Sequence, residues 1–325
     1  MSAIKLINDT TREVTVVDVE IAGDVLRVVI DGTPRLRAKN PAEALQELRA
    51  EHDGFRRFVV SPPRGHDGIN ACVLLPPFSD EAVRTAVIAP QFGYAAIAGT
   101  PLMAGAAALI ETGQTHVTAP ETTLLFDTAA GKTHIVATID NGRCTSLRWT
   151  TTRPKVVVSG QHLELTDDCA VTAMVVSAGL PYVVAPASEL NVAFDNLDAL
   201  GRAGAMLCEA AMCQIGEPEG GVAYHAMIVG DLSIPEHNEA VTVPVACVSA
   251  NGRVWSTPAG TGALSAAGYF TALETLALGR EITTVSPTGF GFRCCIERDS
   301  ASVESGARII ALTQLIGDLS EETRI

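Results

Sequence analysis

The sequence has few basic and few aromatic residues. Lysine and arginine together number 23 against 37 aspartate and glutamate residues, so the formal net charge is −14, and aromatic residues make up 5% of the chain. A surplus of negative charge repels both a phosphate backbone and an anionic lipid surface. We therefore expect neither nucleic acid nor a membrane among the partners.

Long apolar runs are missing as well. The most apolar stretch, residues 95–110, is shorter than a membrane span and is interrupted by Gly99, Pro101 and Gly105. We predict a buried helix there. Residues 1–11 mix charged and polar side chains without the apolar centre of a secretion signal, so we expect a cytoplasmic protein.

The cysteines and histidines lack the spacing of a metal site. No two of the eight cysteines form a C-x-x-C pair, and the seven histidines show no H-x-x-x-H spacing. The adjacent Cys294 and Cys295 fit a core strand. Because 47% of the residues are hydrophobic, the chain can bury a core without disulfides. No nucleotide-binding loop is visible, and we predict no metal and no cofactor.

Short β-branched segments bounded by turns dominate the chain. They predict strands over residues 14–21, 25–32, 56–63, 71–77, 133–140, 155–160, 182–186 and 243–252. Two amphipathic segments, residues 41–52 and 197–213, predict helices on the outside of the sheets.

An internal repeat organises the chain. Ala98-Gly99-Thr100 precedes one small-residue-rich helical segment (100–112), and Ala259-Gly260-Thr261 precedes another (262–278). The two tripeptides lie 161 residues apart (98 to 259), close to half of the 325 residues. This spacing indicates a duplicated domain.

The repeat predicts an α+β fold of two pseudo-twofold-related halves, each a curved sheet or open barrel around a central helix. Helices this rich in alanine and glycine have no wide polar face, so strands should surround them. We place the first half at residues 1–150, with 310–325 able to complete it, and the second at 151–309. Length alone also favours two domains.

Local signals mark the ends of both central helices. Thr100 and Thr261 suit N-caps, Pro101 suits the first helical position, and Gly113 and Gly279 suit the stops. In a pseudo-twofold arrangement both N-termini would offer unpaired N–H groups to one cleft, an arrangement that binds a carboxylate. The alternative is that each tripeptide only caps a core helix.

Several segments resemble, in order, the proline racemase family, which includes hydroxyproline epimerases and trans-3-hydroxyproline dehydratases. SPPRGHDGINACVLLPP (61–77) looks like the family's E-P-R-G-H segment and the strand after it. GYAAIAGTPLMAGAAALIETG (93–113) is similar to the stretch around M-C-G-H-G, and ANGRVWSTPAGTG (250–262) lies over A-D-G-x-x-D-R-S-P-C-G-T-G. The resemblance implies the diaminopimelate epimerase-like fold, with the active site between two halves.

The departures from the family motifs concern its catalytic groups. The two cysteine positions correspond to Ala98 and Ala259, and the histidine and aspartate positions correspond to Thr100 and Trp255. Alanine has no ionisable group, a hydroxyl is a weak acid, and an indole N–H only donates, so two-cysteine racemisation is not expected. The catalytic residues, if any, stay unassigned.

The resemblance still implies a binding site for a small carboxylate. The residues expected to bind it are Tyr94, Gly99, Thr100, Trp255, Thr257, Gly260, Thr261 and Gly262. Tyr94 and Trp255 would make the pocket more aromatic than a proline site. We interpret His66 as architectural and His225 as a hydrogen-bonded core histidine.

Two functional hypotheses remain from the sequence. The first is a cofactor-independent isomerase or lyase acting on a small, cyclic or aromatic, carboxylate or amino acid. The second is a non-catalytic relative that binds a carboxylate ligand or a partner protein, with Trp255 filling the cleft. A homodimer is compatible with either hypothesis.

Overall fold

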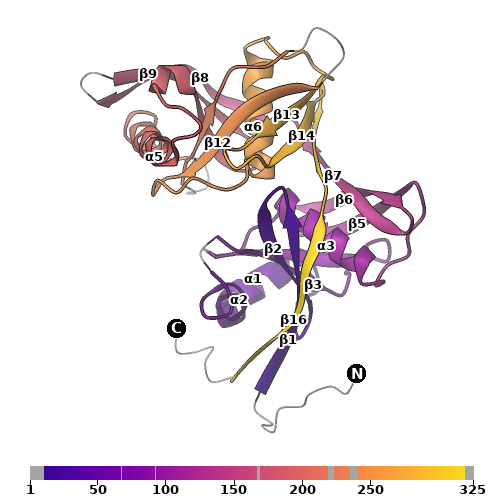
Figure 1. The fold of residues 1–325 in the computed structure, drawn as a ribbon. Coiled ribbons are helices and arrows are strands. Elements are labelled where there is room, and N and C mark those ends of the chain that lie inside the picture. Colours follow the sequence, from indigo (N-terminus) through magenta and orange to yellow (C-terminus); the bar gives the residue numbers. More distant parts are fainter. Residues whose placement is uncertain are drawn as a thin grey trace. The chain divides into compact units, whose positions relative to one another are not determined.

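The computed structural model describes residues 11–66, 68–91, 93–166, 169–218, 223–234 and 240–318. The chain divides into two compact units, which Figure 1 draws as a ribbon. Unit 1 consists of Val25–Leu147 with the described parts of Met1–Ile21 and Gly306–Ile325. Unit 2 consists of Arg148–Ser305 together with the short turn Ala22–Asp24.

The sheet of unit 1 has the strand order β16-β1-β2-β3-β4-β5-β6-β7. Its strands are β1 (Thr11–Ile21), β2 (Asp24–Asp31), β3 (Asn70–Leu75), β4 (Arg84–Pro90), β5 (Glu121–Thr128), β6 (Gly131–Asp140), β7 (Arg143–Thr152) and β16 (Arg308–Asp318). Strand β7 continues into unit 2 at Arg148.

The sheet of unit 2 has the strand order β15-β14-β13-β12-β11-β10-β9-β8. Its strands are β8 (Lys155–Thr166), β9 (Cys169–Ser177), β10 (Pro181–Pro186), β11 (His225–Val229), β12 (Val241–Ser249), β13 (Glu281–Val285), β14 (Gly291–Ile296) and β15 (Ser300–Ser305).

The two units repeat one topology. In unit 1, β2 and β3 are parallel, β3 and β4 antiparallel, β4 and β5 parallel, and β5 and β6 antiparallel. In unit 2 the pairs β10–β11, β11–β12, β12–β13 and β13–β14 follow the same sequence of directions. The structure thus supports the duplication that the repeated tripeptide predicted.

Each unit has one helix that strands surround. Helix α3 (Gly99–Glu111) connects β4 to β5 and packs on β1, β3, β4, β6 and β16, whereas α6 (Gly260–Ala272) connects β12 to β13 and packs on β8 to β15 (Figure 1). Eleven residues of each helix are buried, so neither helix has a solvated face. A helix without a polar face gains its stability from burial on all sides, which explains its central place.

The remaining helices lie outside the sheets. Unit 1 has α1 (Pro41–Glu51) and α2 (Asp53–Val60), and unit 2 has α4 (Ala187–Leu190) and α5 (Leu197–Gln214). In α1 and α5 an asparagine side chain caps the first turn: Asn40 accepts from Glu43 N, and Asn196 accepts from Ala199 N. The apolar face of α5 packs on the side of β10, β11 and β12 opposite to α6.

Two local expectations are wrong. Residues 56–63 were predicted as a strand, but residues up to Val60 belong to α2, because Phe55, Phe58 and Val59 recur at the helical spacing and pack into one core. The second central helix ends at Ala272, six residues before Leu278, because Glu274 turns left-handed (φ 58°) and closes the helix.

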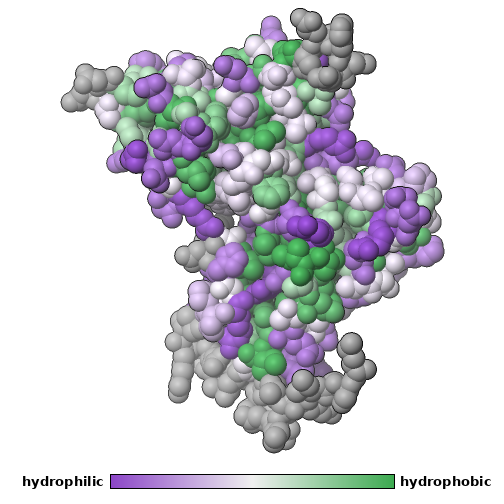
Figure 2. Space-filling view, in the orientation of Figure 1, coloured by the Kyte–Doolittle hydropathy of each residue, from purple (hydrophilic) through white to green (hydrophobic). Residues whose placement is uncertain are grey.

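The surface of the described residues is mainly polar with apolar patches (Figure 2). In unit 1, Ile310, Leu312 and Ile316 of the terminal strand β16 are exposed. None of the described helices is both long and apolar enough to cross a membrane.

One buried guanidinium ties three segments of unit 1 together. Arg27 on β2 binds both carboxylate oxygens of Asp18 on β1, at 2.8 and 2.9 Å, and donates to the carbonyls of Val59 (2.8 Å) and Arg64 (2.6 Å). The side chains of Arg27 and Asp18 are both largely buried. Removing Arg27 therefore leaves the Asp18 carboxylate buried without its partner.

We predict that Arg27→Ala lowers the free energy of unfolding by about 3–5 kcal/mol, because the buried charge that remains has lost the partner that compensated its desolvation. Arg37→Ala is the matched control, because Arg37 is 74% exposed where it meets Glu47 and Glu51, and its loss should change stability little. Urea unfolding of both variants measures the difference. Equal effects would show that the Arg27 network does not stabilise unit 1.

Candidate active site

The N-termini of the two central helices lack side-chain caps. The N-cap residues are Ala98 for α3 and Ala259 for α6, and neither forms a side-chain hydrogen bond to its helix. The threonine caps predicted from the sequence are therefore wrong: Thr100 and Thr261 lie inside the first turn, where helical backbone prevents them from acting as N-caps. Pro101 is accordingly the third helical residue, and Gly113 (φ 69°) follows the helix end as predicted.

The uncapped turns leave backbone donors available to a ligand. In α6 the first intrahelical bond runs from Ala263 N to Ala259 O (2.8 Å), so the N–H groups of Gly260, Thr261 and Gly262 precede the hydrogen-bonded ladder. In α3 the corresponding bond runs from Leu102 N to Ala98 O (3.3 Å).

The two N-termini differ in donor number. Pro101 has no N–H, so α3 offers only the amides of Gly99 and Thr100, whereas α6 offers three. No acidic residue occupies the first turn of either helix, so the positive end of each helix dipole is not neutralised from within the turn. Both ends suit an anion, and α6 supplies more donors.

The backbone of Ala259 is unusual. Its φ of 56° and ψ of 143° lie in a region that residues with a side chain rarely adopt, whereas Ala98 is extended with φ −156° and ψ 130°. Strained backbone of this kind clusters at functional sites, where the surrounding structure holds it in place. Thr257 helps to hold it, because its buried hydroxyl accepts from Ala259 N at 3.3 Å.

The loop before α6 is pinned by further hydrogen bonds. Trp255 N donates to Cys247 O on β12 at 2.9 Å. The carbonyl of Ser256 accepts from the hydroxyls of Ser286 (2.7 Å) and Thr288, and the Ser256 hydroxyl donates to Gly23 O at 3.4 Å. Residues 255–259 are thus fixed relative to the sheet of unit 2.

Three aromatic side chains from separate elements meet beside this turn. The hydroxyl of Tyr182 on β10 and that of Thr261 are 2.9 Å apart, which places the phenol at the first turn of α6. The ring of His225 on β11 lies 5.7 Å from the ring of Tyr182 and 5.8 Å from that of Trp255, which it meets edge-on. We call Tyr182, His225, Trp255 and the first turn of α6 the α6 site.

Two nitrogens of the α6 site are buried without a hydrogen-bond partner. They are His225 Nδ1 and Trp255 Nε1. The expectation of a hydrogen-bonded core histidine holds only in part: the imidazole has a backbone hydrogen bond with Ala223, whereas Nδ1 has no partner among the described residues. An unsatisfied buried polar atom costs about 1–3 kcal/mol, and native proteins rarely leave two side by side without a function.

The residues predicted in unit 1 lie in the segment that leads into α3. Tyr94 is buried, with its carbonyl accepting from Arg49 at 2.9 Å, and the guanidinium of Arg56 lies 6.0 Å from its ring centroid. Gly99 is buried and Thr100 is half-buried at the start of α3. His66 is exposed in the turn between α2 and β3, in keeping with an architectural role.

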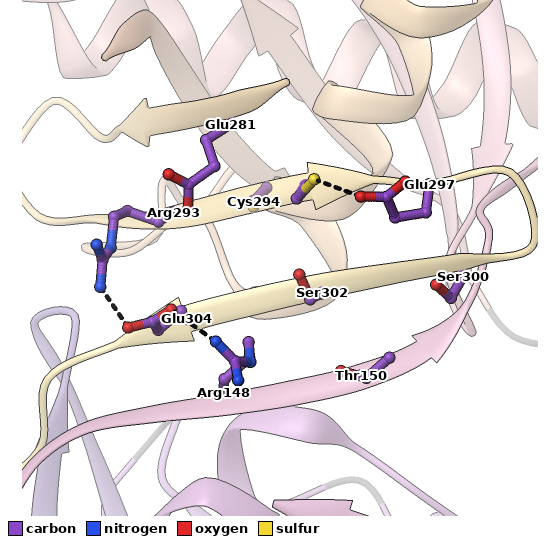
Figure 3. A pocket seen from close by; sticks show the side chains of 10 residues that line it. Arg148, Thr150, Glu281, Arg293, Cys294, Glu297, Ser300, Ser302 and Glu304 are labelled. Atoms are coloured by element: carbon purple, nitrogen blue, oxygen red, sulfur yellow. Dashed lines mark hydrogen bonds and ion pairs between the residues drawn. The ribbon is translucent and has the colours of Figure 1, made fainter. Parts of the chain in front are cut away.

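A polar groove of about 340 Å³ lies on the outer face of unit 2 (Figure 3). It involves none of the predicted residues. Arg148 and Arg293 both pair with Glu304, and the thiol of Cys295 lies 3.6 Å from a carboxylate oxygen of Glu297. Both arginines that line the groove are thus paired with a carboxylate, so neither is a free cation for a carboxylate ligand.

One acidic cluster in unit 1 has metal-like spacing. Ligand atoms of Glu47, Glu51 and His52 lie within 4.8 Å of one another. The Arg37 side chain donates to both carboxylates, including Glu51 at 2.6 Å, and so supplies the positive charge that a metal would bring. The sequence did not single out this group, which we interpret as an ion-paired surface cluster.

Residues 16–314 match the family model of proline racemase. The chain belongs to the proline racemase family. Its matches to curated family members are partial. Over 141 residues it is 33% identical to 4-hydroxyproline 2-epimerase 1 of Rhizobium rhizogenes, which covers 43% of this chain and 41% of the relative. The alignment thus spans less than half the length of that relative.

Two further comparisons extend over more of the chain. It is 26% identical over 255 residues to trans-3-hydroxy-L-proline dehydratase of Bacillus thuringiensis subsp. konkukian, covering 76% of this chain and 75% of that protein. The crystal structure of a hydroxyproline epimerase from Agrobacterium vitis with bound trans-4-hydroxy-L-proline is similar with a TM-score of 0.79 and 22% identity, covering 94% and 93% of the two chains. The predicted α+β fold class is confirmed.

We predict that Ala259→Gly and Ala98→Gly have different effects on stability. Glycine adopts positive φ freely, so at position 259 it relieves about 1–3 kcal/mol of strain and offsets its own entropic cost of about 0.5–1 kcal/mol. At position 98 the backbone is extended and unstrained, so glycine brings only its entropic cost. Differential scanning calorimetry should therefore show Ala259→Gly as the more stable variant by about 1 kcal/mol or more. Equal destabilisation would show that Ala259 is unstrained.

Proposed function

We propose that this member of the proline racemase family is a cofactor-independent isomerase or lyase for a small carboxylate or amino acid of cyclic or aromatic character, and that it does not use two-cysteine chemistry. One observation carries the proposal. The N-cap positions of the central helices, which we align with the family's catalytic thiols, hold Ala98 and Ala259. Neither alanine has a side chain that could bond the free N–H groups of the first helical turn.

The backbone N–H groups of the uncapped turns bind the substrate carboxylate in this proposal. A substrate carboxylate accepts hydrogen bonds from backbone N–H groups such as those of Gly260 and Thr261, and the helix dipole favours its charge. The same donors stabilise the additional negative charge that reaches the carboxylate oxygens when the α-proton leaves. Orientation and these amides would then provide much of the rate enhancement.

The aromatic side chains of the α6 site support the substrate class. Trp255 is half-buried and presents flat apolar surface, so a ring attached to the carboxylate can pack against it, whereas the buried Tyr182 supports the first turn of α6 through Thr261. The relatives' names supply two probes of this class, 4-hydroxyproline and trans-3-hydroxy-L-proline.

The cysteines of the chain are poorly suited to replace the missing thiols. Burial raises the pKa of Cys72 and of Cys208 to about 12, and raises the pKa of Cys144 and of Cys295 to about 11. A thiol with such a pKa carries almost no thiolate at neutral pH and is a weak base catalyst. The described cysteines also lie away from the first turns of α3 and α6 in sequence.

The second candidate function is ligand binding without catalysis. It is favoured by the half-buried Trp255, whose indole nitrogen is buried, because a large side chain at this position also fills space that a substrate would need. A binding protein would hold a carboxylate at the same turn without exchanging its α-proton.

We predict that the protein does not invert Cα of L-proline or trans-4-hydroxy-L-proline, because inversion needs two opposed proton-transfer groups and Ala98 and Ala259 cannot transfer protons. Exchange or water elimination should appear with another probe from a panel of trans-3-hydroxy-L-proline and aromatic amino acids. Alkylation of the exposed Cys213 with iodoacetamide should leave this rate unchanged.

Proton NMR measures the exchange, and isothermal titration calorimetry with pyrrole-2-carboxylate measures binding. Formation of D-proline from L-proline at an enzyme-like rate, measured by chiral chromatography, would overturn the proposal. Tight carboxylate binding without exchange of any probe would instead favour the non-catalytic function.

A further inference from the structure

We infer that the His225 imidazole is the proton-transfer group of the α6 site, taking the role that thiols would otherwise have. The inference rests on the proposed function, because it assumes that a carboxylate substrate binds at the first turn of α6. It starts from the buried, unpartnered Nδ1 atom of His225 and from the direction in which its strand presents the ring.

The strand register points His225 toward α6. Side chains of β11 alternate, so His225 and Met227 share one face, while Ala226 and Ile228 belong to the core cluster on the α5 side. A methyl group added at Gly262 would lie 2.6 Å from Met227 Cε and 3.2 Å from Tyr182 Cε1. The face that carries His225 is therefore the one in contact with the first turn of α6.

The surroundings of His225 suit a neutral base. Burial lowers the pKa of His225, and a hydrogen bond with the backbone of Ala223 opposes part of this decrease. The neutral imidazole therefore predominates at pH 7. The neighbouring Tyr182 and Trp255 are uncharged at that pH. The buried Nδ1 of His225 has no hydrogen-bond partner among the described residues, so a ligand can use it.

Other titratable groups face the same region. Cys247 on β12, paired with Met227, and Tyr182 on β10 both have pKa values raised by burial, so they stay protonated and uncharged. Asp24 is the nearby carboxylate and raises the pKa of Cys247 further. Asp24 is therefore the rival base that an experiment must separate from His225.

A single imidazole can complete an elimination. For an amino acid with hydrogen at Cα and hydroxyl at Cβ, an imidazole nitrogen takes the α-proton, and the electrons of the broken C–H bond form a Cα=Cβ double bond as the C–O bond breaks. The departing hydroxide takes the proton back from the imidazolium and leaves as water. The histidine returns to its neutral form, and no oxidant, reductant or metal is consumed.

A site with a single base also disfavours racemisation. Inverting Cα needs a donor on the face opposite to the base. A lone base returns the proton to the side from which it came, which gives exchange with solvent and retention of configuration. His225 thus predicts elimination or retentive exchange as the characteristic outcome at this site.

The experiment compares His225→Gln with two other variants in the full-length protein. His162→Gln is the matched control, because His162 is exposed on β8 of the same unit, and Asp24→Asn tests the rival base. Rates of α-deuterium exchange and elimination are measured with trans-3-hydroxy-L-proline and the aromatic amino acids of the panel. Circular dichroism checks that each variant folds.

We expect His225→Gln to slow the reaction by 10²- to 10⁴-fold, the usual contribution of a general acid–base group, while the affinity for pyrrole-2-carboxylate changes less than 10-fold. The rate of the parent should fall as pH drops, with a midpoint below the ordinary histidine pKa of 6.5, because the charged imidazole cannot accept a proton. Loss of activity in Asp24→Asn with full activity in His225→Gln would overturn the inference and leave the proposed function intact.

NMR of the histidine side chains provides a second measurement that does not depend on turnover. The ring of pyrrole-2-carboxylate keeps its carboxylate-bearing carbon planar, as in a deprotonated substrate. Its binding should shift the imidazole resonances assigned by comparison with His225→Gln. If the parent binds this probe and the His225 resonances do not move, His225 lies away from the ligand and the inference is wrong. If the parent neither binds nor turns over any probe, the proposed function itself fails.

Discussion

The constraint on which the structure depends is the burial of an apolar helix on all sides. Neither α3 nor α6 has a polar face, so each is stable only where strands surround it. Such a helix must still satisfy or expose the N–H groups of its first turn. The outer helices solve this with Asn40 and Asn196, whereas the central helices have alanine at the N-cap and leave the donors uncapped. The fold thereby leaves one turn with uncapped backbone N–H groups in each unit.

The duplicated turns have diverged. Pro101 reduces the number of donors at α3, while the strained Ala259 and the cluster of Tyr182, His225 and Trp255 occur at α6. Strain, additional amides and unsatisfied buried nitrogens in one place are features that stability alone does not favour. We therefore assign the chemistry of the protein to unit 2. We propose that the chain binds a carboxylate at the first turn of α6 and that one imidazole replaces thiol chemistry there.

Much of the fold was predictable from the sequence, and much of the site was not. The repeated tripeptides and the small-residue helices after them led to the duplication and to the family. The strand predicted at residues 56–63 failed because its β-branched composition concealed the helical spacing of Phe55, Phe58 and Val59. The sequence could not show that Nδ1 of His225 lacks a partner, because this depends on which distant segments surround the ring. The positive φ of Ala259 was also hidden, since alanine normally avoids that conformation.

The most direct test of the central claim is a crystal structure with 4-bromopyrrole-2-carboxylate, whose bromine is located by its anomalous scattering. We expect the carboxylate at the amides of Gly260 and Thr261, with the ring beside Trp255 and His225. Bromine in the polar groove of Arg148 and Arg293, or on any surface away from the first turn of α6, would contradict it.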